Sequence, residues 1–218
     1  MTIPGPVNKL LLWGAGGHSK VVLDVARAAG LFHEIAYLDD GGNRRGTSFA
    51  GCAIMGGPAE IPSLAAKGFS HLLVCIGDNR ARAGCLARGM AAGLQAATLI
   101  HPSAVISPSA EIGAGTVVMP RVVVNAFARI GRNCIVNTGA IVEHDCVVGD
   151  HVHLAPGSIL GGAAAVDAYS FIGTGAVVLP KAHVEEGAVL GAGAVVLRSL
   201  EAGVTAVGVP ARPRAPRG

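Results

Sequence analysis

Aromatic residues are scarce in this 218-residue chain. Phe, Trp and Tyr make up 4% of it, although 51% of the residues are hydrophobic. Globular cores usually gain bulk from aromatic rings. With so few rings, Val, Ile, Leu, Ala and the 32 Gly must fill the interior. This mixture favours thin repeated layers over one thick core.

The chain also lacks the sequence patterns of disulfide-rich secreted proteins, of small zinc-binding domains and of membrane-spanning proteins. Its five Cys are scattered and include no C-x-x-C pair, so no disulfide framework or zinc knuckle is indicated. No apolar run reaches the roughly 18 residues of a transmembrane helix, and the first apolar run is too short for a signal peptide. A net charge of +3 does not suggest a nucleic-acid platform. We therefore expect a cytoplasmic protein with reduced thiols, no membrane span and no nucleic-acid partner.

The first half of the chain alternates strand and helix patterns, which predicts a small parallel α/β sheet. In the first predicted helix, Val21, Val22, Val25 and Ala29 are expected to form the buried face, and Gly30 to end it. Residues 41–51 are expected to form a loop. The predicted strands are 9–14, 34–40, 52–57, 71–78 and 95–102, and the predicted helices are 18–30, 58–68 and 79–93.

After His101 the sequence repeats with a period of six. From Ile106 to Val196, every sixth residue is Val, Ile or Leu, which makes sixteen positions in one register. If about a third of residues were aliphatic, chance would produce this less than about once in a million. Two residues before each aliphatic lies a mostly small side chain, and Gly often follows the aliphatic.

A six-residue period predicts a parallel β-helix. Each hexapeptide forms one short strand and one corner, and three hexapeptides form one triangular coil with the aliphatic pointing inward. Sixteen repeats correspond to about five coils, stacked about 4.8 Å apart. A β-sandwich would instead need period two with irregular turns. We predict an α/β subdomain over residues 1–101, a β-helix over 102–200 and a C-terminal tail over 201–218.

Several motifs together resemble a known family. They are GAGGHSKVV (14–22), YLDD (37–40), CIGDN (75–79), HPSAVISPSAEIG (101–113), NTGAIVEHDCVVGDHVHLAPG (137–157) and GVPAR (208–212). The set is similar to the hexapeptide-repeat nucleotide-sugar acetyltransferases, which acetylate the 4-amino group of UDP- or GDP-linked 4-amino-4,6-dideoxysugars. The resemblance implies a left-handed β-helix, a homotrimer, acetyl-CoA as co-substrate and a place in polysaccharide biosynthesis. Overall resemblance favours GDP-perosamine over a UDP-linked sugar.

The Gly-rich turn that follows the first predicted strand is the first candidate site. Glycines at 14, 16 and 17 allow backbone N–H groups to approach phosphate at a helix N-terminus. Ser19 stands at the third Gly position of the dinucleotide fingerprint, which argues against NAD. The glycines could also serve only a tight turn. The resemblance assigns nucleotide-sugar binding to Gly16, Gly17, His18, Asp39, Asp40 and Gly77, with Asp39 or Asp40 on ribose hydroxyls or a base edge.

Glu143-His144-Asp145 is the second candidate site. Acetyl transfer to an amine needs a group that removes a proton from nitrogen. Histidine titrates in the right range, and an adjacent carboxylate can hold its second ring nitrogen. The resemblance makes His144 the general base and Asp145 its partner, with Glu143 the less favoured partner. No Cys lies in this triplet to accept the acetyl group, so direct attack in a ternary complex is expected.

A third set of residues is assigned to acetyl-CoA by the resemblance alone. His153, Gly162, Thr174 and Ala192 occupy its contact positions along the groove between subunits, and the Gly162 N–H is a candidate oxyanion donor. Arg212 in the tail could lie near the CoA phosphates, or the tail could simply be solvated. No bound metal is expected.

Three alternative functions remain open from the sequence. A sialic-acid-pathway O-acetyltransferase shares the architecture. A zinc enzyme of the γ-carbonic-anhydrase type would need His144, His151 and His153 as ligands, but their spacing does not match that family's pattern and the Gly-rich half would be unexplained. A non-catalytic binding module is the third alternative.

Overall fold

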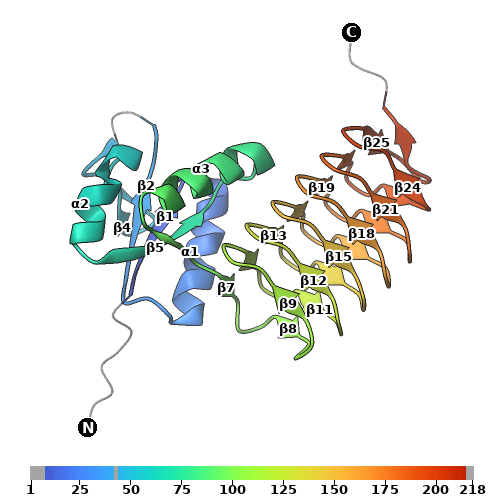
Figure 1. Ribbon diagram of the computed structural model, residues 1–218, viewed down its shortest axis with the longest axis horizontal. Helices are drawn as coiled ribbons and strands as arrows, with labels where there is room; N and C mark the ends of the chain where they lie inside the picture. The colour runs from blue at the N-terminus through green and yellow to red at the C-terminus, as the bar shows by residue number, and fades with distance from the viewer. Residues whose placement is uncertain (1–7, 42–43, 215–218) are drawn as a thin grey trace. The chain divides into compact units, whose positions relative to one another are not determined.

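The computed structural model describes residues 8–41 and 44–214. The chain divides into two compact units, Met1–Ile100 and His101–Gly218 (Figure 1). The first unit combines helices with a parallel sheet, and the second is built from short strands alone. Among the described residues, no helix combines the length and apolar character needed to cross a bilayer.

The sheet of the first unit is parallel throughout. Its strands lie in the order β2 (Glu34–Leu38), β1 (Lys9–Trp13), β5 (Phe69–Val74) and β6 (Gln95–Ala96). Leu10, Leu11 and Leu12 of β1 are all fully buried, because a parallel sheet covered on both faces needs apolar residues on both. The carboxyl ends of β1, β2 and β5 therefore share one edge, and the residues after these ends gather there.

Helix α1 (Gly17–Ala29) ends at Gly30, as predicted, in a left-handed conformation with φ 65°. Its predicted buried face was partly wrong. Val21 is 39% exposed and Ala29 is only partly buried, whereas Leu23 and Ala26 are buried. The inward series runs 19, 22, 23, 25 and 26, the spacing of one helix face. The series begins with the buried Ser19, whose hydroxyl donates to Gly16 O at 2.8 Å. Because Ser19 is polar, a search for apolar residues at helical spacing did not find the start of the series.

Residues 48–53 form a hairpin in place of the predicted loop and separate strand. Strands β3 (Ser48–Phe49) and β4 (Cys52–Ala53) pair antiparallel. Ala50 and Gly51 between them have φ values of 49° and 80°, the positive pair that a tight I′ turn requires. Alanine is unusual in this conformation, so the turn carried no sequence signal.

The remaining elements of the first unit follow the predicted order with shorter bounds. The segment predicted as one strand over 95–102 splits, because only β6 joins the sheet and β7 follows separately. The other elements are η2 (Pro58–Glu60), α2 (Ile61–Ala66), α3 (Asn79–Ala91) and β7 (Leu99–Ile100).

The second unit is a left-handed parallel β-helix, which confirms the predicted fold class. Every aliphatic of the six-residue series is the second residue of a two-residue strand. The sixteen strands are β8 (Val105–Ile106), β9 (Glu111–Ile112), β10 (Val117–Val118), β11 (Val123–Val124), β12 (Arg129–Ile130), β13 (Ile135–Val136), β14 (Ile141–Val142), β15 (Val147–Val148), β16 (His153–Leu154), β17 (Ile159–Leu160), β18 (Ala165–Val166), β19 (Phe171–Ile172), β20 (Val177–Val178), β21 (His183–Val184), β22 (Val189–Leu190) and β23 (Val195–Val196).

The strands stack into three faces, which we name by their members. The aliphatic face is β8-β11-β14-β17-β20-β23, the polar face is β9-β12-β15-β18-β21-β24, and the third face contains β10-β13-β16-β19-β22-β25-β26. Up to β23, paired residues are eighteen apart, as in Val123↔Ile141, whereas the parallel pairs of β24 and β25 are sixteen apart. A residue therefore lies one coil away from the residue eighteen positions later in the sequence.

The interior of the helix is a ladder of aliphatic side chains. From Val118 to Val196 all fourteen inward residues are buried, whereas Ile106 and Ile112 at the first coil are only partly so. The small residues two places earlier, such as Ala128 and Ala140, are fully buried at the corners. Burial of each Val, Ile or Leu stabilises the fold by about 1.5–3 kcal/mol.

The predicted tail over 201–218 is partly wrong, because the sheet continues beyond residue 200. The corner between β23 and β24 (Ser199–Leu200) contains two residues where the others contain four, so the inward positions move to Leu200 and Ala206. Strand β25 (Thr205–Val207) then pairs parallel with β22, and β26 (Arg212–Pro213) pairs antiparallel with β25. Residues 215–218 of the predicted tail lie outside the described residues.

Strand β15 offers a matched test of the ladder. Val148 points inward and is 2% exposed, whereas Val147 points outward and is 42% exposed. We expect Val148→Ala to lower the free energy of unfolding by about 2 kcal/mol, and Val147→Ala to change it by less than about 0.5 kcal/mol. Chemical denaturation of the two variants measures both values. Equal losses would contradict the assignment of the inward face.

Candidate functional site

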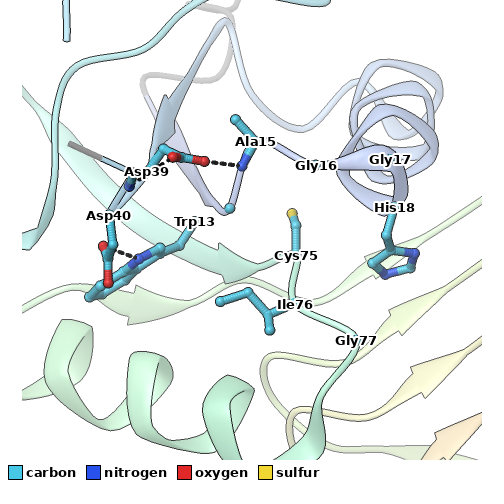
Figure 2. A pocket seen from close by; sticks show the side chains of 12 residues that line it. Trp13, Ala15, Gly16, Gly17, His18, Asp39, Asp40, Cys75, Ile76 and Gly77 are labelled. Atoms are coloured by element: carbon cyan, nitrogen blue, oxygen red, sulfur yellow. Dashed lines mark hydrogen bonds between the residues drawn. The ribbon is translucent and has the colours of Figure 1, made fainter. Parts of the chain in front are cut away.

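A pocket of about 500 Å³ lies at the carboxyl edge of the parallel sheet (Figure 2). It forms where β1, β2 and β5 end side by side. All six residues predicted to bind the nucleotide-sugar line it: Gly16, Gly17, His18, Asp39, Asp40 and Gly77. The tertiary structure thus brings together residues that are up to 61 positions apart in the chain (16 to 77).

The Gly-rich turn leaves open space at the start of α1. A Cβ at Gly16 or Gly17 would meet no atom within 4 Å, whereas Gly14 has φ 106° and lies against the Cys75 carbonyl. The positive φ at position 14 therefore requires a glycine. Gly16 and Gly17 keep the pocket side of the turn free, where backbone N–H groups can meet an anion.

Asp39 holds this turn in place. Its carboxylate accepts hydrogen bonds from the backbone N–H groups of Ala15 at 2.7 Å and Gly41 at 3.0 Å, and Figure 2 shows the Ala15 contact. Arg44 donates to the same carboxylate at 3.2 Å. Both carboxylate oxygens are thus engaged within the protein. Asp39 shapes the pocket, and Asp40 is the better placed of the two to meet a ligand.

Asp40 is oriented but remains accessible. The indole N–H of Trp13 donates to its Oδ1 at 2.9 Å (Figure 2), and Arg88 donates to its Oδ2 at 3.3 Å. The Arg88 guanidinium lies over the Trp13 ring, 4.7 Å from its centroid. The Asp40 side chain is still 49% exposed. A carboxylate held by two donors in this way presents its remaining lone pairs to the pocket.

His18 extends from the first turn of α1 into the pocket (Figure 2). Burial lowers its pKa to about 4, and the nearby positive charge of Arg82 contributes in the same direction. The imidazole is therefore neutral between pH 5 and 8. It can exchange hydrogen bonds with a ligand there, but it adds no positive charge.

Sequence reasoning missed about half of the pocket lining. Trp13, Ala15, Gly41, Cys75 and Ile76 also contribute. Each lies within two residues of a predicted residue or of Gly14, so neighbourhood along the chain was the available signal. Burial raises the pKa of the Cys75 thiol, which keeps this group protonated and unsuited to attack.

The predicted catalytic pair forms at a corner of the β-helix. Nδ1 of His144 lies 2.8 Å from Oδ2 of Asp145, and the two side chains are 62% and 58% exposed. An ionised carboxylate only accepts hydrogen bonds, so Nδ1 carries the proton and the neutral ring keeps its lone pair on Nε2. Asp145 adopts φ 60°, a left-handed conformation shared by corner residues of this helix and not predictable from a non-glycine residue.

Gly162 faces the imidazole from the next coil. A Cβ at this position would lie 2.6 Å from Nε2 of His144, so any larger residue would displace the ring. Glu143 does not contact the imidazole in the same way, because its carboxylate accepts a hydrogen bond from the Asn125 amide at 2.9 Å. The contacts thus favour Asp145 over Glu143 as the partner of His144.

Of the remaining residues predicted to contact acetyl-CoA, Thr174 and Ala192 lie at another corner and His153 lies on a strand of the third face. His153 is buried on β16, edge-on to Phe171 with ring centroids 5.0 Å apart. Thr174 and Ala192 are exposed one coil apart, where the Gly193 N–H donates to the Thr174 carbonyl. His144 and Gly162 lie at the opposite edge of the aliphatic face. One chain therefore does not bring these two groups together.

The aliphatic face between these two corners is apolar on its outer side as well. The first residue of each of its strands points outward, and none is fully buried. These outward residues are Val105, Val123, Ile141, Ile159, Val177 and Val195. Val105 is exposed and the other five are partly exposed, and a continuous apolar row of this kind is typical of surfaces that bind another protein chain.

The histidines suggested as zinc ligands do not converge. His144 lies at one corner, whereas His151 lies at a different corner and stacks on Tyr169 with centroids 4.9 Å apart. Among the described residues, no group of three His, Cys, Asp or Glu side chains is placed to hold a metal ion. Within one chain, the described residues therefore do not bring the three histidines of the zinc alternative together.

Cys146, two residues after His144, points into the coil. Its Sγ contacts the Gly161 carbonyl at 3.2 Å, and burial raises its pKa. The thiol closest in sequence to the catalytic pair is thus protonated and inaccessible, which agrees with the expected direct transfer without an acetyl-cysteine.

Two family models match the chain. The PglD N-terminal domain matches residues 9–88, and the bacterial transferase hexapeptide model of six repeats matches residues 127–162. A search among curated proteins found no match.

Solved structures of similar proteins cover nearly the whole chain. PerB from Caulobacter crescentus, in complex with CoA and GDP-perosamine, is 39% identical over 98% of this chain and 99% of PerB, with a TM-score of 0.90. The acetyltransferase domain of PglB from Neisseria gonorrhoeae, in complex with acetyl coenzyme A, is 40% identical over 94% and 98%, with a TM-score of 0.88. WeeI from Acinetobacter baumannii is 29% identical over 95% and 100%, with a TM-score of 0.84.

These matches agree with the two units of the fold and confirm the resemblance inferred from the motifs. The chain belongs to the family of acetyl-CoA-dependent hexapeptide-repeat N-acetyltransferases that carry a PglD-type N-terminal domain.

Proposed function

We propose that the chain transfers an acetyl group from acetyl-CoA to the 4-amino group of a nucleotide-linked 4-amino-4,6-dideoxysugar. GDP-perosamine is favoured over a UDP-linked sugar, because the 39% identical PerB was solved with GDP-perosamine and CoA. The observation that carries the proposal is the pocket at the sheet edge, which gathers all six nucleotide-sugar candidates in one place. Cytoplasmic location and a role in polysaccharide biosynthesis are part of the same proposal.

In this proposal the first unit holds the nucleotide part of the acceptor. The diphosphate lies at the Gly16–Gly17 turn, where a side chain would have filled the space. Asp40 accepts hydrogen bonds from the base edge or the ribose hydroxyls, since both of its oxygens are oriented from the protein side. His18 hydrogen-bonds the ligand as a neutral ring.

The chemical step is carried by His144. Its Nε2 takes the proton from the acceptor nitrogen as that nitrogen attacks the thioester carbon. Asp145 holds Nδ1–H and stabilises the imidazolium that forms. The tetrahedral intermediate then collapses and the C–S bond breaks. The CoA sulfur leaves and takes up the proton that the His144 imidazolium gives back.

Gly162 is proposed to stabilise the oxyanion of that intermediate. Its N–H makes no hydrogen bond within residues 8–41 and 44–214, whereas its carbonyl accepts from the Lys181 N–H at 3.0 Å. A free N–H one coil away from the base is suited to a developing negative charge. His153, Thr174 and Ala192 are proposed to line the path of the coenzyme.

We further propose that the functional form is a homotrimer. The aliphatic face separates the His144–Gly162 corner from the corner that carries Thr174 and Ala192. If a second chain packs along this face, its second corner can meet the first chain's His144. A closed ring of three chains would satisfy all such contacts.

A sialic-acid-pathway O-acetyltransferase remains the second candidate, and only acceptor chemistry separates the two. Thiol release from acetyl-CoA should be measured with GDP-perosamine, UDP-linked 4-amino sugars and nucleotide-free sialic acid. Turnover with sialic acid alone would replace the present proposal.

The role of His144 is tested by kinetics. We expect His144→Asn to lower kcat by about 10²–10⁴-fold while both substrates still bind. Asp145→Asn should cost less, because Asp145 only orients the ring. The loss in His144→Asn should shrink as pH rises, since more acceptor amine then arrives deprotonated. A variant with near-normal kcat at neutral pH would remove His144 from the mechanism.

The site assignment of Asp40 is tested by the KM of each substrate. Asp40→Ala should raise the KM of the nucleotide-sugar by about tenfold or more, because a charged hydrogen bond is lost, and should leave the KM of acetyl-CoA nearly unchanged. Arg88→Met, which removes one partner of Asp40 but keeps the carboxylate, serves as the control and should have a smaller effect. A rise confined to the KM of acetyl-CoA would show the assignment to be wrong.

The trimer is tested by light scattering. The wild-type protein should scatter at three times the 21.8 kDa chain mass. Val177 and Val147 are both the first residue of a strand, but Val177 lies on the aliphatic face and Val147 on the polar face. Val177→Asp should weaken the trimer, because it places a charge in an apolar interface, whereas Val147→Asp should not. A stable wild-type monomer at micromolar concentration would refute the proposal.

A further inference from the structure

We propose that Arg82, which lies behind the pocket wall, is the cation that allows the pocket to hold the diphosphate of the nucleotide-sugar. The inference rests on the proposed function and adds a residue that the sequence analysis did not assign. It starts from the charges around the pocket.

The side chains that line the pocket do not suit an anion. They include the carboxylates of Asp39 and Asp40, but no Lys or Arg. A nucleoside diphosphate brings about two negative charges to the same space. His18 cannot compensate, because it is neutral at physiological pH. The backbone N–H groups of the Gly16–Gly17 turn favour phosphate, but full positive charge can come only from groups behind the lining.

Two arginines are already paired with the carboxylates. Arg44 contacts Asp39 at 3.2 Å and Arg88 contacts Asp40 at 3.3 Å. These pairs cancel the repulsion that the carboxylates would exert on a phosphate. These two pairs leave no surplus positive charge, so a further cation would add to the attraction that the Gly16–Gly17 turn exerts on an anionic ligand.

Arg82 supplies this charge from the opposite wall. It lies on α3 and is 1% exposed. Its guanidinium donates to the carbonyl oxygens of Ile76 and Gly77, both at 3.1 Å, and these two residues line the pocket. The charge is thus one backbone layer away from the ligand space. In a water-poor environment a charge acts over a longer distance than at the surface.

The contacts of Arg82 also remove a source of repulsion. A carbonyl oxygen that points at a bound phosphate repels it, because the carbonyl oxygen carries partial and the phosphate full negative charge. Arg82 donates hydrogen bonds to the two carbonyl oxygens of this wall. Asn79 holds the guanidinium in place through its Oδ1 at 2.7 Å. The positive charge of Arg82 also contributes to the lowered pKa of His18, which lines the pocket.

The expected experiment compares a diphosphate with its nucleoside. Binding of GDP and guanosine, and of UDP and uridine, is measured by calorimetry for the wild-type protein, Arg82→Gln and Arg82→Lys. Glutamine keeps a hydrogen-bond donor for the carbonyls but not the charge. Lysine keeps the charge but not the planar guanidinium with its several donors. Arg80→Met, on the same helix but exposed, controls for loss of a screened surface charge.

We expect Arg82→Gln to weaken diphosphate binding by about tenfold or more and nucleoside binding by less than about twofold. Arg82→Lys should keep the ratio of the two affinities within about threefold of the wild-type value, and Arg82→Met, which also removes the charge, takes the place of the Gln variant if that variant does not fold. Arg80→Met should leave the ratio unchanged. The KM of acetyl-CoA should not change in any variant.

Equal losses of diphosphate and nucleoside binding in Arg82→Gln would overturn the inference, because they would mean that Arg82 only shapes the loop. Collapse of the ratio in Arg82→Lys would also overturn it. The proposed function fails by a different result, namely a wild-type protein that binds neither diphosphate and acetylates no nucleotide-sugar.

Discussion

Stacking of one inward aliphatic residue per hexapeptide is the constraint on which the catalytic half of this protein depends. Because fourteen consecutive inward residues are buried, the chain must return to the same position every eighteen residues. Corner residues are then placed as reliably as core residues. Gly162 faces the imidazole of His144 for this reason alone, since the two residues are eighteen apart. The same stacking forces Asp145 into a left-handed conformation at its corner.

For the proposed function, the first unit has to hold an anionic ligand beside two carboxylates. Parallel strands bring the ends of β1, β2 and β5 to one edge, so the acidic residues after β2 and the Gly-rich turn after β1 share one pocket. Both carboxylate oxygens of Asp39 accept backbone hydrogen bonds that hold the turn. Trp13 and Arg88 donate hydrogen bonds to Asp40. In our proposal, buried and paired arginines set the electrostatics of the pocket, although none of them lines it.

Local sequence patterns predicted most of the helices and strands. They failed where a contact outside the pattern determined the local structure. The six-residue series identified every inward position up to Val196, and it stopped where a shortened corner shifted the inward residues to Leu200 and Ala206. The buried face of α1 was misassigned because Ser19 satisfies its hydroxyl within the helix turn. The hairpin around Ala50 was missed because alanine rarely adopts a positive φ.

The amino-acid sequence by itself determined the repeat, the register of the β-helix and the residues grouped at the two sites. Periodicity and motifs are local properties, so they can be read without coordinates. Only the tertiary structure decided the role of each side chain. It separated Asp39 from Asp40, directed Glu143 to Asn125, and placed Arg82 behind Ile76 and Gly77. Hydrogen bonds between distant residues and burial of charge depend on the folded arrangement, and no local pattern encodes them.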